Sequence, residues 1–431
     1  MKYITSIWAT LILLTILIGI RISDPILVEQ TRLNVFDQYI QSLPEKISSD
    51  VILLNIGEDS LDVLGQYPFP RQTYAQMISD LRAAGAGMIV FTIMFPEPDR
   101  FGGDEIFASW IDSNGIILAQ DADRSGRSTR APFVGYATFG DAHPMDFIYE
   151  YEGLVTNIES LEEKAWGVGL INASPEVDNI TRRIPLISQI NGGLYPSLAL
   201  ETVRAIQDKL SYTIKVNETG IEGILLRPFD IPTDVDGSIW LKWNSVFPEL
   251  EYGVDKLGTL NGETVIIGVN AKGIANQIST PGGLLYPHQL QANTLQTIIS
   301  GDPISRPAWT SIAELGMMLV GALIIILSMY YLPIWVSGLA FLGIVSGTGY
   351  LSYYMWSSTY VLLDLSYSLI LYIIILTSTG FNNFYRQYML RQQIRKQFET
   401  YLDPRQVALL QKDPSLLRLG GERKEMTFMF M

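Results

Sequence analysis

Three consecutive apolar segments near the C-terminal end constrain the fold more than any other feature of this sequence. They cover about residues 309–331, 334–354 and 359–381, and each is close to the ~20 residues that an α-helix needs to cross a bilayer. The connectors Leu332-Pro333 and Trp356-Ser357-Ser358 are short enough only for tight turns. Aromatic residues gather at the segment ends, as they do at membrane–water interfaces. Residues 309–381 therefore predict three transmembrane helices.

A fourth apolar segment lies at the N-terminal end, where Tyr3–Ile20 is preceded by Lys2 and followed by Arg21. A cleaved signal peptide is the alternative interpretation, but it would need small residues at a cleavage site, and Gly19 to Ser23 match that pattern poorly. We therefore expect residues 1–23 to be an uncleaved transmembrane helix. Four crossings would place both termini on the same side of the membrane.

The charge distribution predicts which side that is. The formal net charge is −14, yet residues 382–431 hold nine Lys and Arg against five Asp and Glu. Basic residues beside a membrane segment are typical of its cytoplasmic side. We expect a plasma-membrane protein with cytoplasmic termini and residues 24–308 outside. The acidity argues against nucleic acid as a partner, and the absence of cysteine excludes disulfides and thiolate metal sites.

Residues 24–308 are expected to form one α/β domain, because strand-like and helix-like segments alternate and no Ser/Gly-rich linker divides them. Such crossovers imply a largely parallel sheet with both faces buried. The complete expected architecture is this extracytoplasmic domain, four transmembrane helices and a cytoplasmic helical linker. Strands are expected over residues 51–56, 88–95, 116–119, 168–172, 181–190, 238–243 and 264–269, and helices over 70–84, 105–111, 196–207 and 287–299.

A ligand-binding site in this domain is expected at the ends of the parallel strands, the usual position in open α/β sheets. The candidates by position are Asp59, Arg71, Asp99 and Asn270. The basis is the fold class alone, and the ligand is unknown.

Divalent metal binding is weakly supported by the sequence. The acidic residues between Asp99 and Asp123 match no calcium-loop spacing and are expected to form a solvated face. Two histidines are too few to define a metal site, and His288, at the start of a helix, is expected to cap or pack. The residues considered are Asp99, Asp104, Glu105, Asp121, Asp123, His143 and His288.

Glu314 and Asp364 are the acidic residues inside the membrane block, at similar expected depth near its outer face. One interpretation makes them a signal-coupling pair that reports the state of the outer domain, since ionisable groups within membranes are usually functional. The other interpretation is that both side chains reach the interface and are hydrated.

The cytoplasmic segment 382–402 is expected to continue the last transmembrane helix. Leu390, Ile394, Phe398 and Tyr401 form an apolar stripe with steps of four, four and three residues. We favour a parallel helix contact in a homodimer, in which these four residues couple the signal. The alternative is a basic amphipathic helix lying on the anionic leaflet.

Several segments, taken in order, resemble one family of sensor domains. They include Tyr67-Pro68-Phe69-Pro70-Arg71, Val90–Asp99, Asp178–Pro185, Tyr195–Ala199, Ile266–Ala271 and His288–Leu295. Together they resemble the bacterial CHASE-type-2 extracytoplasmic sensor domain, which implies one helix before the domain and three after it. Thr92 departs from the acidic residue common in that family, so any role of such a carboxylate is not expected here.

The tail, residues 403–431, resembles the beginning of a class III nucleotide cyclase domain. The resemblance runs from Tyr401-Leu402-Asp403-Pro404 to Leu419-Gly420-Gly421-Glu422-Arg423 and on to Phe430. It implies a parent adenylate cyclase that converts ATP to cAMP and pyrophosphate in a homodimer. It also implies Mg²⁺ or Mn²⁺ bound by carboxylates expected just after Met431, so we expect no catalytic or metal residue within this chain. The alternative is a receptor with a kinase or diguanylate cyclase output, itself non-enzymatic.

Overall fold

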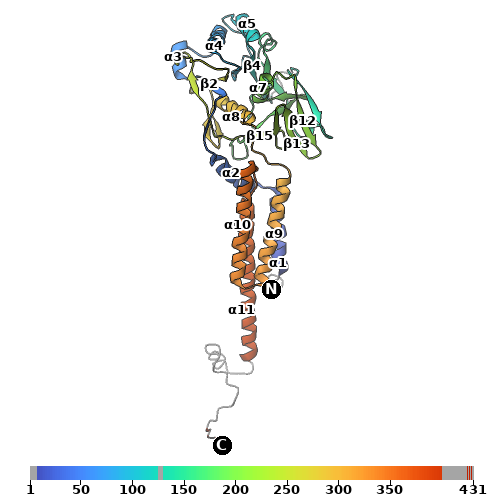
Figure 1. The fold of residues 1–431 in the computed structure, drawn as a ribbon. Coiled ribbons are helices and arrows are strands. Elements are labelled where there is room, and N and C mark those ends of the chain that lie inside the picture. Colours follow the sequence, from blue (N-terminus) through green and yellow to red (C-terminus); the bar gives the residue numbers. More distant parts are fainter. Residues whose placement is uncertain (1–6, 125–129, 400–424, 426, 428, 430–431) are drawn as a thin grey trace. The chain divides into compact units, whose positions relative to one another are not determined.

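The largest sheet of the protein is mostly parallel and lies inside an α/β domain (Figure 1). In this computed structural model its strand order is β17-β2-β18-β3-β4-β7, and β8 also pairs with β4. All pairings are parallel except that between β4 and β7. The strands are β2 (Val51–Ile56), β3 (Ile89–Phe91), β4 (Ile116–Asp123), β7 (Gly153–Val155), β8 (Gly167–Leu170), β17 (Glu249–Glu251) and β18 (Thr264–Val269).

The structure describes residues 7–124, 130–399, 425, 427 and 429. The chain divides into two compact units. One contains Asp24–Met317 and Gly347–Ser368, and the other contains Met1–Ser23, Met318–Ser346 and Leu369–Met431.

Both faces of the central sheet are buried, because its side chains alternate between two hydrophobic clusters. Leu53 of β2 packs with residues of α7 and α8, whereas its neighbour Leu54 packs with residues of α4 and α5. The helices of the domain are α3 (Glu58–Leu64), α4 (Arg71–Ala84), α5 (Asp104–Asn114), α6 (Glu159–Glu162), α7 (Leu198–Ile206) and α8 (Pro287–Ile299).

A second sheet of four strands, which sequence analysis did not predict, packs in the same core as α7 and α8. Its order is β14-β13-β12-β5, antiparallel except between β12 and β5. β12 alternates buried residues with more exposed polar ones, so it lacks the continuous apolar run of the central strands. They are β5 (Gly135–Phe139), β12 (Ser211–Asn217), β13 (Gly220–Leu226) and β14 (Phe229–Pro232).

The remaining strands form small sheets around this core. The expected strand over 181–190 is instead two strands, β9 and β10, which belong to different sheets. Four sets complete the list: β6 (Glu150–Tyr151), β10 (Ile187–Ile190) and β11 (Gly193–Pro196); β9 (Arg183–Pro185) and β15 (Ser238–Trp240); β1 (Lys46–Ile47) and β16 (Ser245–Val246); β19 (Ile278–Thr280) and β20 (Gly283–Leu285). A 3₁₀ turn covers Pro144–Asp146.

The predicted βαβαβ order and parallel pairing of the central sheet are confirmed, and β2, β18 and α8 have the predicted bounds. The strand expected over 88–95 is shorter, because after Phe91 the chain leaves the sheet and the Phe95 amide hydrogen-bonds the buried side chain of Asn157. The expectation of one largely parallel sheet is too simple, since several sheets are present.

The long helices are α1 (Ile7–Ser23), α2 (Ile26–Gln41), α9 (Trp309–Tyr331), α10 (Ile334–Thr359) and α11 (Ser366–Glu399). By length and composition, α9, α10 and α11 could each cross a membrane. Among the described residues a fourth span is possible if α1 and α2, bent by 73° to each other, count together. The bounds of α9 are those predicted.

The predicted turn between the last two membrane helices is misplaced. α10 continues to Thr359 and α11 begins only at Ser366, so the connector is residues 360–365. Val361, Leu362 and Leu363 are buried, which explains why apolar content alone could not separate this connector from a membrane helix. α11 continues into the expected cytoplasmic helix, to Glu399. Tyr401 and nearly all of residues 403–431 lie outside the described residues.

Candidate functional site

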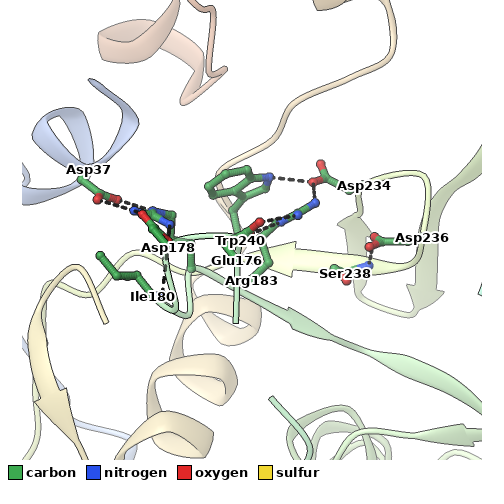
Figure 2. A network of polar contacts seen from close by, with 10 residues as sticks. Asp37, Glu176, Asp178, Ile180, Arg183, Asp234, Asp236, Ser238 and Trp240 are labelled. Atoms are coloured by element: carbon green, nitrogen blue, oxygen red, sulfur yellow. Dashed lines mark hydrogen bonds and ion pairs between the residues drawn. The ribbon is translucent and has the colours of Figure 1, made fainter. Parts of the chain in front are cut away.

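A buried arginine joins α2 to the loop before β9. Arg182 donates to Asp37 on α2 through Nε and Nη2, at 2.7 and 2.8 Å. It also donates to Asp178 through Nη1 and Nη2, at 2.9 and 2.7 Å. The Arg182 side chain is completely buried. Figure 2 shows Asp37 on its helix facing Asp178 across this contact. A buried arginine between two carboxylates holds the helix and the loop in a fixed relation.

The ionisation of this group is stabilised by its partners. Burial by itself lowers the pKa of Arg182, but its hydrogen bonds to Asp37 and Asp178 outweigh burial and raise that pKa above the ordinary value. The same hydrogen bond from Arg182 lowers the pKa of Asp178. Arg182 and Asp178 are therefore both charged at neutral pH.

The next residue, Arg183, forms a second network on β9 (Figure 2). Its Nε and Nη2 donate to Glu176 at 2.7 and 3.0 Å, and its Nη1 donates to Asp234 at 2.7 Å. The Trp240 indole N–H donates to the same Asp234 oxygen at 2.9 Å. Burial raises the pKa of Asp234, against the opposing effect of Arg183. This network fixes Trp240 on β15.

Trp240 belongs to an apolar group that we call the junction cluster. Its ring meets Phe36 of α2 edge-on, with centroids 5.9 Å apart. Tyr39 of α2 packs beside the cluster and stacks on Trp356 of α10, with centroids 5.7 Å apart. The buried members of the junction cluster are Leu33, Phe36, Ile40, Trp240, Ile304, Trp356 and Leu362.

A backbone ladder runs beside the junction cluster. β9 pairs with β15, Trp240 of β15 forms an antiparallel bridge with Ile304, and Ser305 forms a parallel bridge with Val361. The Ser305 amide donates to the Tyr360 carbonyl at 3.1 Å, and the Leu362 amide donates to the Ser305 carbonyl at 3.0 Å. The connector before α11 is thus hydrogen-bonded to the end of the α/β domain.

Glu314 and Asp364 are brought together at this connector. The Asp364 backbone N–H donates to Glu314 Oε1 at 2.8 Å, and both side chains are fully buried. Arg306 Nη2 donates to the Glu314 carboxylate at 3.2 and 3.4 Å. Asp364 Oδ1 accepts from the amide and the hydroxyl of Ser366, the first residue of α11. These contacts link the start of α9 to the start of α11.

Arg32 of α2 adds a further charge to this site. It donates to both oxygens of Asp24, at 2.9 and 2.8 Å. Burial lowers its pKa, but the hydrogen bond and charge of Asp24, together with the charges of Asp364 and Glu314, raise the pKa above the ordinary value. Arg32 therefore lies within electrostatic range of Glu314 and Asp364.

Residues 10–331, more than half of the chain, match the CHASE2 domain family. The chain belongs to the CHASE2 domain family. CHASE2 domains are extracellular sensory domains of signalling proteins, which supports the expectation of a membrane receptor. No curated protein and no solved structure matches the chain.

Two of the four candidate ligand residues of the CHASE2 domain lie together. The Arg71 amide donates to Asp99 at 3.1 Å, while its guanidinium donates to Asp104 and packs over Phe95. Arg71 and Asp99 thus have partners within the fold.

The other two candidates lie apart from that pair. Asp59 is exposed in the first turn of α3, and Asn270 follows β18, where its buried Oδ1 has no hydrogen-bond partner among the described residues. Ligand binding by these four residues stays a prediction.

The remaining site predictions concern metals and the tail. Among the described residues, no group of three or more His, Asp or Glu side chains could hold a metal ion. His288 is fully buried and its Nε2 lies 2.8 Å from Asn55 Oδ1, so it packs as expected.

Leu390 and Ile394 are exposed on α11, which also includes Phe398. Their coupling role stays a prediction.

Sequence reasoning missed most of the residues that form this site. Arg182 and Asp178 were noticed only as part of the CHASE-type-2 resemblance, and Asp37, Arg306 and Trp240 were not singled out. Asp37 and Arg182 are 145 positions apart, so no local pattern pairs them. The available signal was the presence of charged residues in the mostly apolar face of α2, where Asp37 lies among Leu33, Phe36 and Ile40.

Proposed function

We propose that this chain is the receptor portion of a membrane-bound class III adenylate cyclase that acts as a homodimer. The CHASE2 domain would sense a small extracytoplasmic ligand and shift the start of α11. α11 would carry the shift to two catalytic domains, which convert ATP to cAMP and pyrophosphate.

One observation carries the receptor part of the proposal. The backbone ladder from β15 through Ile304 and Ser305 ends on Val361, five residues before α11 begins. Two backbone hydrogen bonds hold the connector before α11 against Ser305, so a displacement of Ser305 would move the connector. α11 then runs as one helix from Ser366 to Glu399, so a displacement of its first turn can reach its cytoplasmic end.

The cyclase output rests on the resemblance of residues 401–430 to the entry of a class III cyclase domain. Mg²⁺ or Mn²⁺, held by carboxylates of that domain, would supply activation of the ribose hydroxyl and neutralisation of the triphosphate. We assign a different part to the residues that the structure describes. Their part is to hold and move α11.

The proposal is tested by cAMP formation from ATP with Mn²⁺. We would compare membranes carrying the protein encoded by the complete gene with membranes carrying residues 1–431 alone. cAMP formed only by the complete protein supports the cyclase. If the complete protein forms cyclic di-GMP or phosphorylates a protein instead, the receptor has a different output and the cyclase proposal fails.

A further inference from the structure

A cavity of about 290 Å³ lies beside the junction cluster, close to the lower end of the volume range of ligand sites. Its walls come from the loop after α2, from residues 242–245, from the end of α8 and from the connector before α11. The lining residues that matter here are Lys46, Lys242, Gln296, Asp302, Tyr360 and Glu45.

Lys242 is the most buried charge of this cavity, with 11% of its side chain exposed. Its Nζ lies 2.8 Å from Asp302 and 3.8 Å from the centroid of the Tyr360 ring. An ammonium group has three donors, and Asp302 occupies one of them. The carboxylate of Asp302 is thus already neutralised, while Lys242 can still donate to a ligand.

Two further donors line the cavity without an acceptor. Gln296 accepts a hydrogen bond from Ser48 through Oε1, but its amide Nε2 donates to no described residue. Lys46 has no ion pair among the described residues either. Donors from three separate elements therefore line one partly open cavity, in which Asp302 is already paired.

The charges of the cavity favour an anion over a cation. Burial lowers the pKa of Lys242, Asp302 raises it, and the positive charge of Lys46 lowers it again. Lys46 therefore lies close enough to Lys242 for their charges to repel, and Asp302 attracts both lysines. A second anion beside the two ammonium groups would offset the repulsion further. Glu45 is exposed at the rim and is not among the groups that shift the pKa of Lys242.

We propose that this cavity binds a small anion through its carboxylate or phosphate group, held by Lys46, Lys242 and the Gln296 amide. Binding itself is independent of the cyclase output. Its regulatory consequence rests on the proposed function: the Tyr360 carbonyl accepts from Ser305, so an anion that draws Lys242 away from the Tyr360 ring acts on the backbone ladder.

Two sources could supply this anion, a free solute or the head group of a membrane phospholipid. The connector that carries Tyr360 joins two membrane helices, so lipid phosphate would be near. The purified chain in maltoside micelles, which contain no phosphate, provides the reference. Inorganic phosphate and acetate are titrated by calorimetry at constant ionic strength. We expect saturable binding of at least one of the two probes.

Three variants decide whether the cavity is the site at which phosphate or acetate binds. Lys46→Gln and Lys242→Gln are expected to raise the dissociation constant at least tenfold. Lys272→Gln, at an exposed lysine outside the cavity, should leave it unchanged. Lys46 is exposed, so its variant keeps the fold even if Lys242→Gln does not.

Phosphatidylglycerol nanodiscs distinguish the two sources. If lipid phosphate is the occupant, the free-anion isotherm disappears in these discs for the wild-type chain, and the discs stabilise wild type more than Lys46→Gln. If a free solute is the occupant, the isotherm persists. The proposal is overturned if neither probe binds and lipid stabilisation is the same for Lys46→Gln and Lys272→Gln. These readouts need no cyclase activity, so they stand or fall separately from the proposed output.

Discussion

The backbone amide of Asp364 donates to the carboxylate of Glu314 at 2.8 Å, across 50 residues of sequence. Both acidic side chains are fully buried, so the interpretation that they are hydrated at the interface is wrong. Their role as a signal-coupling pair stays a prediction. Arg306 and Arg32 supply the positive charge that makes burial of the carboxylates tolerable.

Glu314→Ala should destabilise the protein more than Glu314→Gln. Alanine leaves the buried Asp364 amide without an acceptor, which costs about 1–3 kcal/mol. Glutamine keeps an oxygen for that amide and loses only the charge that faces Arg306. The measurement is the thermal unfolding midpoint in nanodiscs. Equal midpoints for the two variants would show that the amide contact contributes nothing.

Asp37→Ala should weaken the attachment of α2 to the CHASE2 domain. It removes two hydrogen bonds from the buried Arg182, which keeps only Asp178. Hydrogen bonds to charged groups contribute about 1.5–3 kcal/mol each, so we expect a loss of at least ~2 kcal/mol. Asp59→Ala, at an exposed residue, is the control and should change stability by less than ~0.5 kcal/mol. Unfolding midpoints that match for the two variants would contradict this assignment.

Two buried groups should give opposite pH dependences. Burial lowers the pKa of His288 to about 4, so the unfolded state binds more protons and stability should rise with pH between about 4 and 6.5. Burial raises the pKa of Glu201 to about 7, against the effect of its partner Arg204. The folded state then binds more protons, and stability should fall as pH rises from about 4.5 to 7.

Single variants separate these contributions. In Glu201→Gln the His288 contribution remains, so the unfolding midpoint should rise with pH between 4.5 and 6.5. In His288→Gln the Glu201 contribution remains, so the midpoint should fall over the same range. In each variant the free energy of unfolding should change with pH by a slope that approaches about 1.4 kcal/mol per pH unit. Parallel pH profiles for the two variants would mean that at least one of these pKa shifts is absent.

The sequence predicted those parts of the fold that depend on local patterns. Val51–Ile56 and Thr264–Val269 are continuous apolar runs, and buried parallel strands need such runs. The helix α8 starts at Pro287, a residue favoured at the first helical position. The helix α2 was missed because its buried face carries two charged residues, Arg32 and Asp37. Arg32 pairs with Asp24, eight positions earlier, whereas Asp37 pairs with Arg182, 145 positions away.

The site was harder to predict because it consists of long-range pairs. Glu314 and Asp364 were found because acidic residues are rare in membrane segments, which is a local signal. The backbone ladder at Ile304, Ser305 and Val361 has no side-chain signature at all, since bridges join main-chain groups. Only the folded arrangement shows it.

Ile394→Pro should disconnect the CHASE2 domain from its output in the protein encoded by the complete gene. Ile394 lies inside α11, where proline removes a hydrogen bond to Leu390 and clashes with its carbonyl, at a cost of about 3 kcal/mol. Because the natural ligand is unknown, Glu314→Gln serves as the perturbation of the outer site. We expect it to change cAMP formation in the wild-type background.

The same Glu314→Gln change should have no effect on cAMP formation in the Ile394→Pro background, because a broken α11 cannot transmit it. Ile394→Ala, which keeps the helix, is the matched control and should preserve the response. Thermal unfolding of the outer domain should be the same in all three backgrounds, since Ile394 lies outside the CHASE2 match. A full response to Glu314→Gln with proline at position 394 would exclude α11 as the transmitting element, because the signal would then bypass its C-terminal half.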